Sequence, residues 1–189
     1  MLIQTVGVIG AGTMGNGIAQ VFASHGFKVV LHDTNEAALT KGLTTISSSL
    51  DRLIKKAIIT TDDKTKTLDC LQSTTTLKDL AMVDLVVEAA SENLDIKVNI
   101  FKQLDVICKP EAILASNTSS ISLTRIARET KRPHQVIGMH FMNPVPLMKL
   151  VEIIRALQTS EATYQAIETL SKQISKTPVT VNDSPGFIS

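Results

Sequence analysis

Aromatic side chains are scarce in this sequence of 189 residues: they make up 3% of it, with a single tyrosine and no tryptophan. A surface that stacks nucleic-acid bases needs such side chains. The net charge of +1 supplies no general attraction toward phosphate backbones or anionic lipids. We therefore expect neither a nucleic acid nor a membrane surface among the partners of the chain.

Cysteines and long apolar runs are also few. Cys70 and Cys108 lie far apart with no metal-ligand pattern around them. This favours two reduced thiols over a disulfide or a zinc site, and we expect no bound metal. No run of about 18 apolar residues is present, so we expect no membrane-spanning helix. The first five residues lack the basic leader of a secreted protein. We expect a cytoplasmic protein, with an organellar protein that has lost its leader as the alternative.

Apolar segments with strand character alternate with segments of helical periodicity, in a chain long enough to bury one core. This alternation predicts an α/β fold with a doubly wound, mostly parallel sheet. The expected strands are residues 6–9, 27–33, 73–76, 83–89, 112–116, 135–141, 149–154 and 178–181. The expected helices are residues 16–23, 36–56, 62–70, 93–107, 121–130 and 161–174. The helical stretch over about 36–70 exceeds an ordinary crossover and predicts a helical arm.

One glycine-rich turn joins the first expected strand to the first expected helix. It reads Gly10-Ala11-Gly12-Thr13-Met14-Gly15, a G-x-G-x-x-G pattern. The first glycine permits a tight turn, the second lets the backbone approach a pyrophosphate, and the third lets helix and strand pack closely. The N–H groups at the start of the helix favour the phosphates. The turn therefore predicts a Rossmann-like dinucleotide site.

An acidic residue, Asp33, ends the second expected strand, 18 residues after Gly15. A carboxylate at this position accepts hydrogen bonds from an adenosine ribose and repels a 2′-phosphate. Residues 34–38 contain no Arg or Lys, so the sequence favours NAD over NADP. The alternative is a strand-turn-helix with incidental glycines. The order of strand, glycines, helix, strand and acid argues against it.

A histidine and a glutamate stand out within two neighbouring expected strands. His140 ends an apolar run at the edge of the sheet where ligands bind, and Glu152 lies among aliphatic residues. A buried carboxylate needs a partner, and the turn between the strands could place Glu152 against His140. Such a pair would orient the imidazole and favour proton uptake. A capped core histidine and an edge-strand glutamate explain the same residues.

Other polar residues follow strands at the same edge. Residues 116–120, Ser-Asn-Thr-Ser-Ser, could present ligand groups or cap the next helix. Asn143 could contact a ligand or stabilise a turn. Glu88, Glu92 and Lys97 surround the loop after another strand, where a solvated face explains them as well as cofactor contact does.

Two further polar residues, Ser49 and Lys56, share a face of the long helix because they lie seven residues apart. Together with Lys55, they could meet a ligand rich in phosphate. A lysine pair on a helix is more often simply solvated.

The whole chain resembles the NAD-binding domain of the L-3-hydroxyacyl-CoA dehydrogenases, and especially of the bacterial 3-hydroxybutyryl-CoA enzymes. The segments most specific to this family are the one around His140 and the Ser-Asn-Thr-Ser-Ser segment. One departure is Met142, where a second phenylalanine is usual. The segments that carry the resemblance are residues 10–15, 85–90, 114–120, 138–146, 148–154 and 183–188.

The resemblance implies an NAD-linked oxidation of the 3-hydroxyl of a short-chain acyl-CoA thioester, or the reverse reduction, as in fatty acid and butanoate metabolism. It implies that His140 is the general base and Glu152 its partner, that Ser119 holds the reacting oxygen, and that Asn143 holds the site. By the same resemblance, Ser49 and Lys56 meet CoA. The residues that would contact the cofactor are Gly10, Ala11, Gly12, Thr13, Met14, Gly15, Asp33, Glu92, Lys97, Ser119 and Asn143.

The resemblance also predicts a domain plan. Residues 1–184 would form the cofactor-binding domain, and residues 185–189 would begin the connection to a helical C-terminal domain that is absent here. In the family that domain forms the homodimer and closes the substrate cleft, so we expect the isolated domain to be weakly active. The alternatives are a dehydrogenase of a free hydroxy acid or sugar acid, as in crystallin-like relatives, and an NAD-binding module without catalysis.

Overall fold

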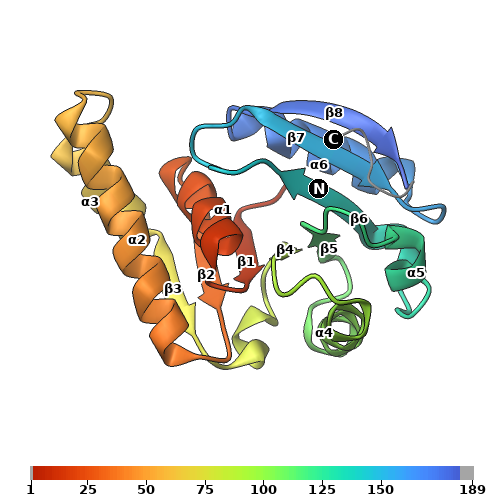
Figure 1. The fold of residues 1–189 in the computed structure, drawn as a ribbon. Coiled ribbons are helices and arrows are strands. Elements are labelled where there is room, and N and C mark those ends of the chain that lie inside the picture. The colour runs from red at the N-terminus through yellow and green to blue at the C-terminus, as the bar shows by residue number, and fades with distance from the viewer. Residues whose placement is uncertain (1, 184–189) are drawn as a thin grey trace.

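Eight strands form a single sheet in the computed structural model, which describes residues 2–183 (Figure 1). Their order across the sheet is β3-β2-β1-β4-β5-β6-β7-β8. The strands are β1 (Thr5–Ile9), β2 (Lys28–His32), β3 (Leu71–Thr74), β4 (Leu85–Glu88), β5 (Ile113–Ser116), β6 (Val136–Phe141), β7 (Leu150–Arg155) and β8 (Thr177–Asn182). The six strands from β3 to β6 are parallel, β7 is antiparallel to β6, and β8 is parallel to β7. The sheet is therefore mostly parallel, as predicted.

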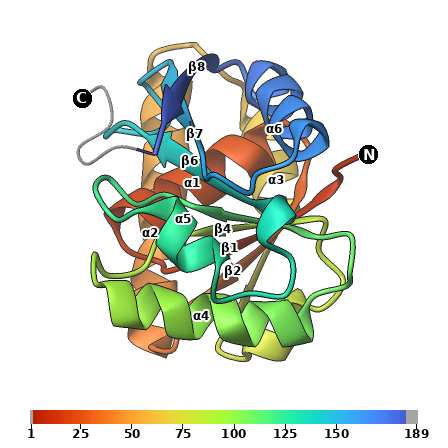
Figure 2. The same ribbon diagram turned by 90° about the vertical axis from the view of Figure 1, so that its right-hand side faces the viewer.

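Helices cover both faces of this sheet. They are α1 (Thr13–Ser24), α2 (Glu36–Lys55), α3 (Thr61–Asp69), α4 (Leu94–Ile107), α5 (Leu123–Ala127) and α6 (Glu161–Gln173). Two short 3₁₀ helices that the pattern did not predict are η1 (Leu77–Leu80) and η2 (Pro133–Gln135). Figure 2 shows α4 and α5 on the side of the sheet away from α1 and α6.

Two apolar clusters hold the layers together. The first joins the sheet to α1, α2 and α6 through residues such as Phe22, Ile46 and Leu170. The second joins the other face to α4 and α5 through residues such as Phe101 and Ile126. Because helices cover both faces, the residues of β4, β5 and β6 are all buried, which explains their continuous apolar runs.

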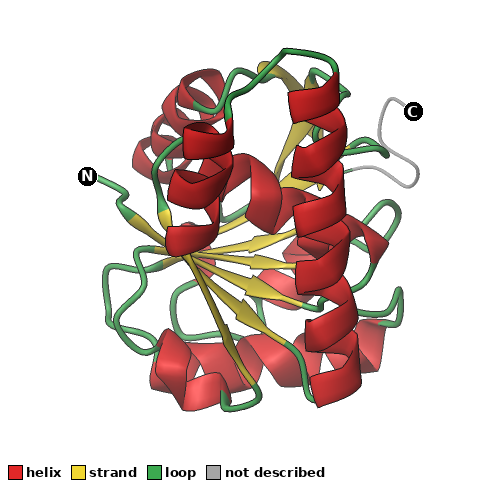
Figure 3. Ribbon diagram, turned by 90° about the vertical axis from the view of Figure 1, so that its left-hand side faces the viewer, coloured by secondary structure: helices red, strands yellow, loops and turns green. Residues whose placement is uncertain are grey.

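The predicted arm consists of α2 and α3, and Figure 3 shows how far α2 extends along the molecule. Its apolar stripe, which includes Ile46 and Leu50, joins the same cluster as α1, so the arm is anchored along one face. Thr60 caps α3 and forms a capping box with Asp63, in which each side chain binds the other's backbone N–H.

The order of the strands fixes where a ligand can bind. The chain runs outward from β1 to β2 and β3, and then returns to place β4 on the other side of β1. In open α/β sheets, ligands bind at such a switch point, beyond the carboxyl ends of the strands. Here that edge carries the turn after β1, the loop after β4, the loop after β5 and the end of β6.

The described part of the chain contains no helix long and apolar enough to cross a membrane. Within residues 2–183, no group of three or more histidine, cysteine, aspartate or glutamate side chains is arranged to hold a metal ion. Cys70 and Cys108 are both free thiols, and burial raises the pKa of Cys108 to about 11. The expected connection at 185–189 lies outside the described residues.

Candidate functional site

The glycine turn after β1 is shaped by the absence of side chains. Gly10 has a φ of 94°, and a Cβ there would lie 2.6 Å from the carbonyl oxygen of Ala89. A Cβ on Gly15 would lie 1.7 Å from the carbonyl oxygen of Gly10, so only glycine lets α1 begin so close to β1. In front of Gly12 there is open space, and no side chain caps α1. The first N–H groups of α1 are thus available to an anion.

A cleft of about 620 Å³ lies beside this turn, between the end of β2 and α4. Asp33 lies at its wall, where one carboxylate oxygen accepts the N–H of Ala11 at 2.8 Å and the other accepts the N–H of Asn35 at 2.9 Å. These bonds fix the carboxylate and leave it further lone pairs for ribose hydroxyls. No lysine or arginine is among the residues that line the cleft. The cleft therefore suits an adenosine ribose without a 2′-phosphate.

His32 also lines this cleft and was not among the predicted site residues. Burial lowers its pKa, although the charge of Asp33 acts in the opposite direction. Within the described residues its Nδ1 has no hydrogen-bond partner. The sequence offered no signal for it beyond its place before Asp33.

A second cleft, of about 350 Å³, begins where the first one ends, because Ala89 and Ala90 line both. One extended ligand can therefore occupy the two clefts together. Six of the predicted site residues line this second cleft: Met14, Glu92, Lys97, Ser119, His140 and Asn143.

The expected contact between His140 and Glu152 is present. The two residues face each other in the antiparallel register of β6 and β7. The ring Nδ1 of His140 lies 2.7 Å from Oε2 of Glu152, whose side chain is 2% exposed. Because a carboxylate oxygen only accepts, Nδ1 carries the proton and Nε2 is the basic atom of the neutral ring. The pair therefore holds the ring in one tautomer and one orientation.

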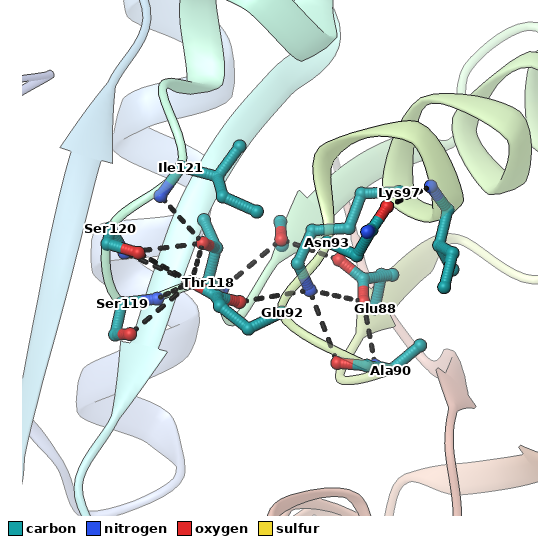
Figure 4. Close-up of polar contacts among 11 residues, drawn as sticks. Glu88, Ala90, Glu92, Asn93, Lys97, Thr118, Ser119, Ser120 and Ile121 are labelled. Atoms are coloured by element: carbon teal, nitrogen blue, oxygen red, sulfur yellow. Dashed lines mark hydrogen bonds and ion pairs between the residues drawn. The ribbon is translucent and has the colours of Figure 1, made fainter.

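Glu88 and Lys97 form an ion pair in the interior (Figure 4). Their side chains are 0% and 1% exposed, so a solvated face does not explain them. One oxygen of Glu88 accepts Lys97 Nζ and the N–H of Ala90, both at 2.7 Å, and the other accepts the hydroxyl of Ser116 at 2.6 Å. The pair thus ties α4 to the ends of β4 and β5. Through Glu88, Lys97 helps to fix the loop after β4, whose residues Ala89 and Ala90 line both clefts.

Glu92 holds the loop that carries Ser119. Its Oε1 accepts hydrogen bonds from the Thr118 hydroxyl and from the backbone N–H and hydroxyl groups of Ser119 and Ser120. Its Oε2 lies 3.5 Å from Lys97 Nζ. Burial opposes ionisation, but the Thr118 bond, the charge of Lys97 and the Ser119 N–H outweigh it and lower the pKa of Glu92. A fixed carboxylate therefore orders the loop at neutral pH. Figure 4 shows the contacts of Glu92 with Thr118, Ser119 and Ser120.

Asn117 contributes more to the site than its sequence predicted. Its side-chain oxygen accepts the N–H of Phe141 at 2.8 Å and so joins the end of β5 to the residue after His140. The alternative role of residues 116–120 as a helix cap falls instead to Ser122, which caps α5. The only feature of the sequence that could have indicated the contact with Phe141 is the position of Asn117 after a buried strand. A helix cap would explain that position equally well.

Asn143 lies exposed at the mouth of the second cleft, in the loop between β6 and β7. Ser49 lies half-buried near the end of α2, and Lys56 is exposed just after it. Neither of these two residues lines the clefts described above. The structure thus brings the predicted catalytic residues together and leaves the expected CoA contacts on the arm.

Comparison with known proteins identifies relatives across the described fold. Residues 5–184 match the family described as "3-hydroxyacyl-CoA dehydrogenase, NAD binding domain". A probable 3-hydroxybutyryl-CoA dehydrogenase of Deinococcus radiodurans is 53% identical over 97% of this chain and 66% of its own length. A 3-hydroxybutyryl-CoA dehydrogenase of Clostridioides difficile is 49% identical over 96% of this chain and 64% of its own length. The chain thus spans about two-thirds of the length of these relatives.

A solved structure agrees with this result. The crystal structure of (S)-3-hydroxybutyryl-CoA dehydrogenase from Ralstonia eutropha is 55% identical and superposes with a TM-score of 0.97. The match covers all of this chain and 66% of that one.

Proposed function

Since this chain belongs to the 3-hydroxyacyl-CoA dehydrogenase family, as an NAD-binding domain, we propose that the protein oxidises L-3-hydroxyacyl-CoA to 3-ketoacyl-CoA or runs the reverse reduction. A short acyl chain such as 3-hydroxybutyryl is the substrate we propose, after the names of the relatives. The observation that carries the proposal is the His140–Glu152 pair, whose histidine lines a cleft that adjoins the dinucleotide cleft.

The residues present fit NAD. The side-chain-free turn at Gly10–Gly15 and the uncapped start of α1 suit a pyrophosphate, and Asp33 suits an unphosphorylated ribose. Ser119 and Asn143 lie in the adjoining cleft, at the far end of the same ligand path. When bound, NAD supplies the hydride acceptor, or NADH the donor, at C3 of the substrate.

The protein groups handle the proton. We propose that His140 Nε2 takes the proton of the 3-hydroxyl as the hydride leaves C3, and returns it in the reverse direction. Glu152 then faces the imidazolium across a 2.7 Å hydrogen bond and stabilises its charge. Ser119 Oγ lies 3.3 Å from Glu92 Oε1. Rotation of that hydroxyl would let it donate to the reacting oxygen and stabilise charge that develops there.

Recognition of CoA remains a proposal that rests on the arm. Lys56 is exposed and could meet a phosphate as a point charge, and Ser49 lies on the same side of α2. We also keep as predictions a homodimer formed outside this domain, the absence of a nucleic-acid partner, and a location in the cytoplasm.

The decisive experiment measures turnover of the full-length protein with acetoacetyl-CoA and NADH, beside acetoacetate and NADH. We expect oxidation of NADH with the thioester and little with the free acid. Turnover of the free acid at an equal rate would favour a hydroxy-acid dehydrogenase. Binding of NADH with no turnover of either compound would favour a binding module.

A further inference from the structure

A lysine that the proposed mechanism does not use lies buried behind the loop between β6 and β7. Lys176 comes after α6 and directly before β8, and it is 8% exposed. Its Nζ donates to the carbonyl oxygen of Val145 at 2.6 Å and to that of Met148 at 2.7 Å. Within residues 2–183 no carboxylate forms an ion pair with it. Burial lowers the pKa of Lys176 and makes its charge costly to keep, so the two bonds offset an appreciable cost.

The loop that Lys176 holds is anchored on its other side by α1. Val145 is buried, and its side chain lies so close to Gly17 that a Cβ on that glycine would be 2.9 Å away. Within the loop, the N–H groups of Leu147 and Met148 both donate to the carbonyl oxygen of Pro144. Figure 1 shows the loop passing beside α1 on its way from β6 to β7. The loop is therefore clamped between a helix and a buried ammonium group.

This loop carries Asn143, one of the residues of the reacting cleft. The side-chain amide of Asn143 forms no hydrogen bond to another described residue, and the residue is exposed. The backbone of the loop consequently decides where this side chain starts and which part of the cleft it can reach. An anchor two residues further along the chain, at Val145, determines where that backbone lies.

We propose that Lys176 is a positioning residue, which fixes the loop between β6 and β7 through Val145 and Met148 and thereby holds Asn143 at the reacting cleft. Its effect on turnover rests on the function proposed above, whereas its hold on the loop does not. Lysine suits the task because an ammonium group has three donors and no acceptor, so it can bind two carbonyl oxygens without burying an unpaired lone pair. Glutamine at this position would bury an acceptor.

The hold on the loop is tested by hydrogen exchange in Lys176→Met, which keeps the length of the side chain and removes its donors. We expect exchange at the N–H groups of Leu147 and Met148 to accelerate by a factor on the order of ten or more. Exchange at Val86 in β4 serves as the reference for global opening. Lys172→Met, on the exposed face of α6, is the matched control. Unchanged exchange at Leu147 and Met148, relative to Val86, would overturn the proposal.

The placement of Asn143 is tested by its side-chain amide resonances and by a double-mutant cycle. In Lys176→Met we expect these resonances to broaden or shift. We also expect kcat of the full-length protein to fall by a factor on the order of ten to a hundred. In an Asn143→Ala background the same substitution should have little further effect on kcat. Equal losses in both backgrounds, or unchanged resonances, would refute the positioning role. A wild-type protein without turnover would refute the proposed function. The amide resonances of Asn143 would then still test the positioning role of Lys176.

Discussion

The two clefts at the edge of the sheet differ in the groups that form them, which are mainly backbone in one and mainly side chains in the other. The cleft beside β1 and β2 is made largely of backbone: a turn without side chains, the uncapped start of α1, and one carboxylate. The cleft beyond β4, β5 and β6 is made of side chains that bind one another, from Glu88 through Glu92 to the His140–Glu152 pair. Binding of a dinucleotide needs donors that any backbone supplies, whereas proton transfer needs particular side chains in fixed places.

This difference between the clefts predicts that substitutions in each of them affect different properties of the protein. Loss of the His140–Glu152 pair should alter turnover and leave the affinity for NADH nearly unchanged. Changes at Asp33 should alter the choice of cofactor and leave proton transfer intact. The substitutions below test this separation.

The largest effect is expected from Glu88→Gln. It removes the charge that faces the buried Lys97 and leaves an ammonium group without its closest anion. Breaking a buried pair in this way costs about 3–5 kcal/mol of unfolding free energy. Chemical denaturation measures the loss. A paired change, Glu88→Gln with Lys97→Met, should recover part of it, and a single variant as stable as wild type would contradict the internal pair.

Next in size is His140→Gln, which removes the proposed general base. In the full-length protein we expect kcat to fall by a factor on the order of 100 or more, equivalent to about 2.7 kcal/mol, with the Kd of NADH changed less than about twofold. Steady-state kinetics and a fluorescence titration measure the two quantities. His134→Gln, at an exposed position in η2, is the control. Near-normal turnover in His140→Gln would remove this residue from the mechanism.

The same contrast explains how far the sequence could lead. The glycine turn and Asp33 lie within 24 residues of one another along the chain, from Gly10 to Asp33, and each acts through a local property, so the sequence predicts them well. The His140–Glu152 pair could be anticipated because a single turn joins the two strands and sets their register.

The interior contacts could not be predicted in this way. Glu88 and Lys97 meet because α4 folds back over the end of β4, and nothing in their spacing distinguishes this contact from a solvated pair. Asn117 binds Phe141 across two neighbouring strands. Lys176, which lies just before the outer strand β8, binds the loop between β6 and β7, about 30 residues earlier in the chain. The last two contacts depend on the order of strands in the sheet, and the first depends on how α4 packs against β4, both of which a single sequence leaves open.

A third prediction uses the opposite end of β4 as a control for the reacting edge. Asp84 accepts hydrogen bonds from Gln4, Thr5 and Lys109. Burial opposes ionisation, but these bonds lower the pKa of Asp84 to about 2, from 3.8. Because the folded pKa lies below the unfolded one, the stabilisation is complete above about pH 4 and is lost as the pH falls toward 2.

Asp84→Asn should therefore cost about 2 kcal/mol of unfolding free energy at neutral pH, and the difference from wild type should shrink between about pH 4 and pH 2. Denaturation at a series of pH values measures it. At neutral pH the folded variant should keep the kcat of wild type. A fall in kcat comparable to that of His140→Gln would show that the two edges of the sheet are not independent.

The smallest effect is expected from Asp33→Ser in the dinucleotide cleft. The substitution removes the charge that repels a 2′-phosphate, and serine still offers an oxygen to the ribose. At the distances of such a contact the repulsion is worth about 1–2 kcal/mol, so the ratio of the Kd values for NADPH and NADH should narrow about tenfold. Because Asp33 also holds the N–H of Ala11, NADH itself should bind somewhat less tightly.

Titrations with both cofactors measure the ratio of the two Kd values. Glu36→Gln, which removes a nearby exposed acid from the start of α2, controls for general charge. Equal affinities for the two cofactors in the unmodified protein would contradict the role of Asp33. A large loss of kcat at saturating NADH would instead show that the backbone-built cleft and the side-chain-built cleft act as one.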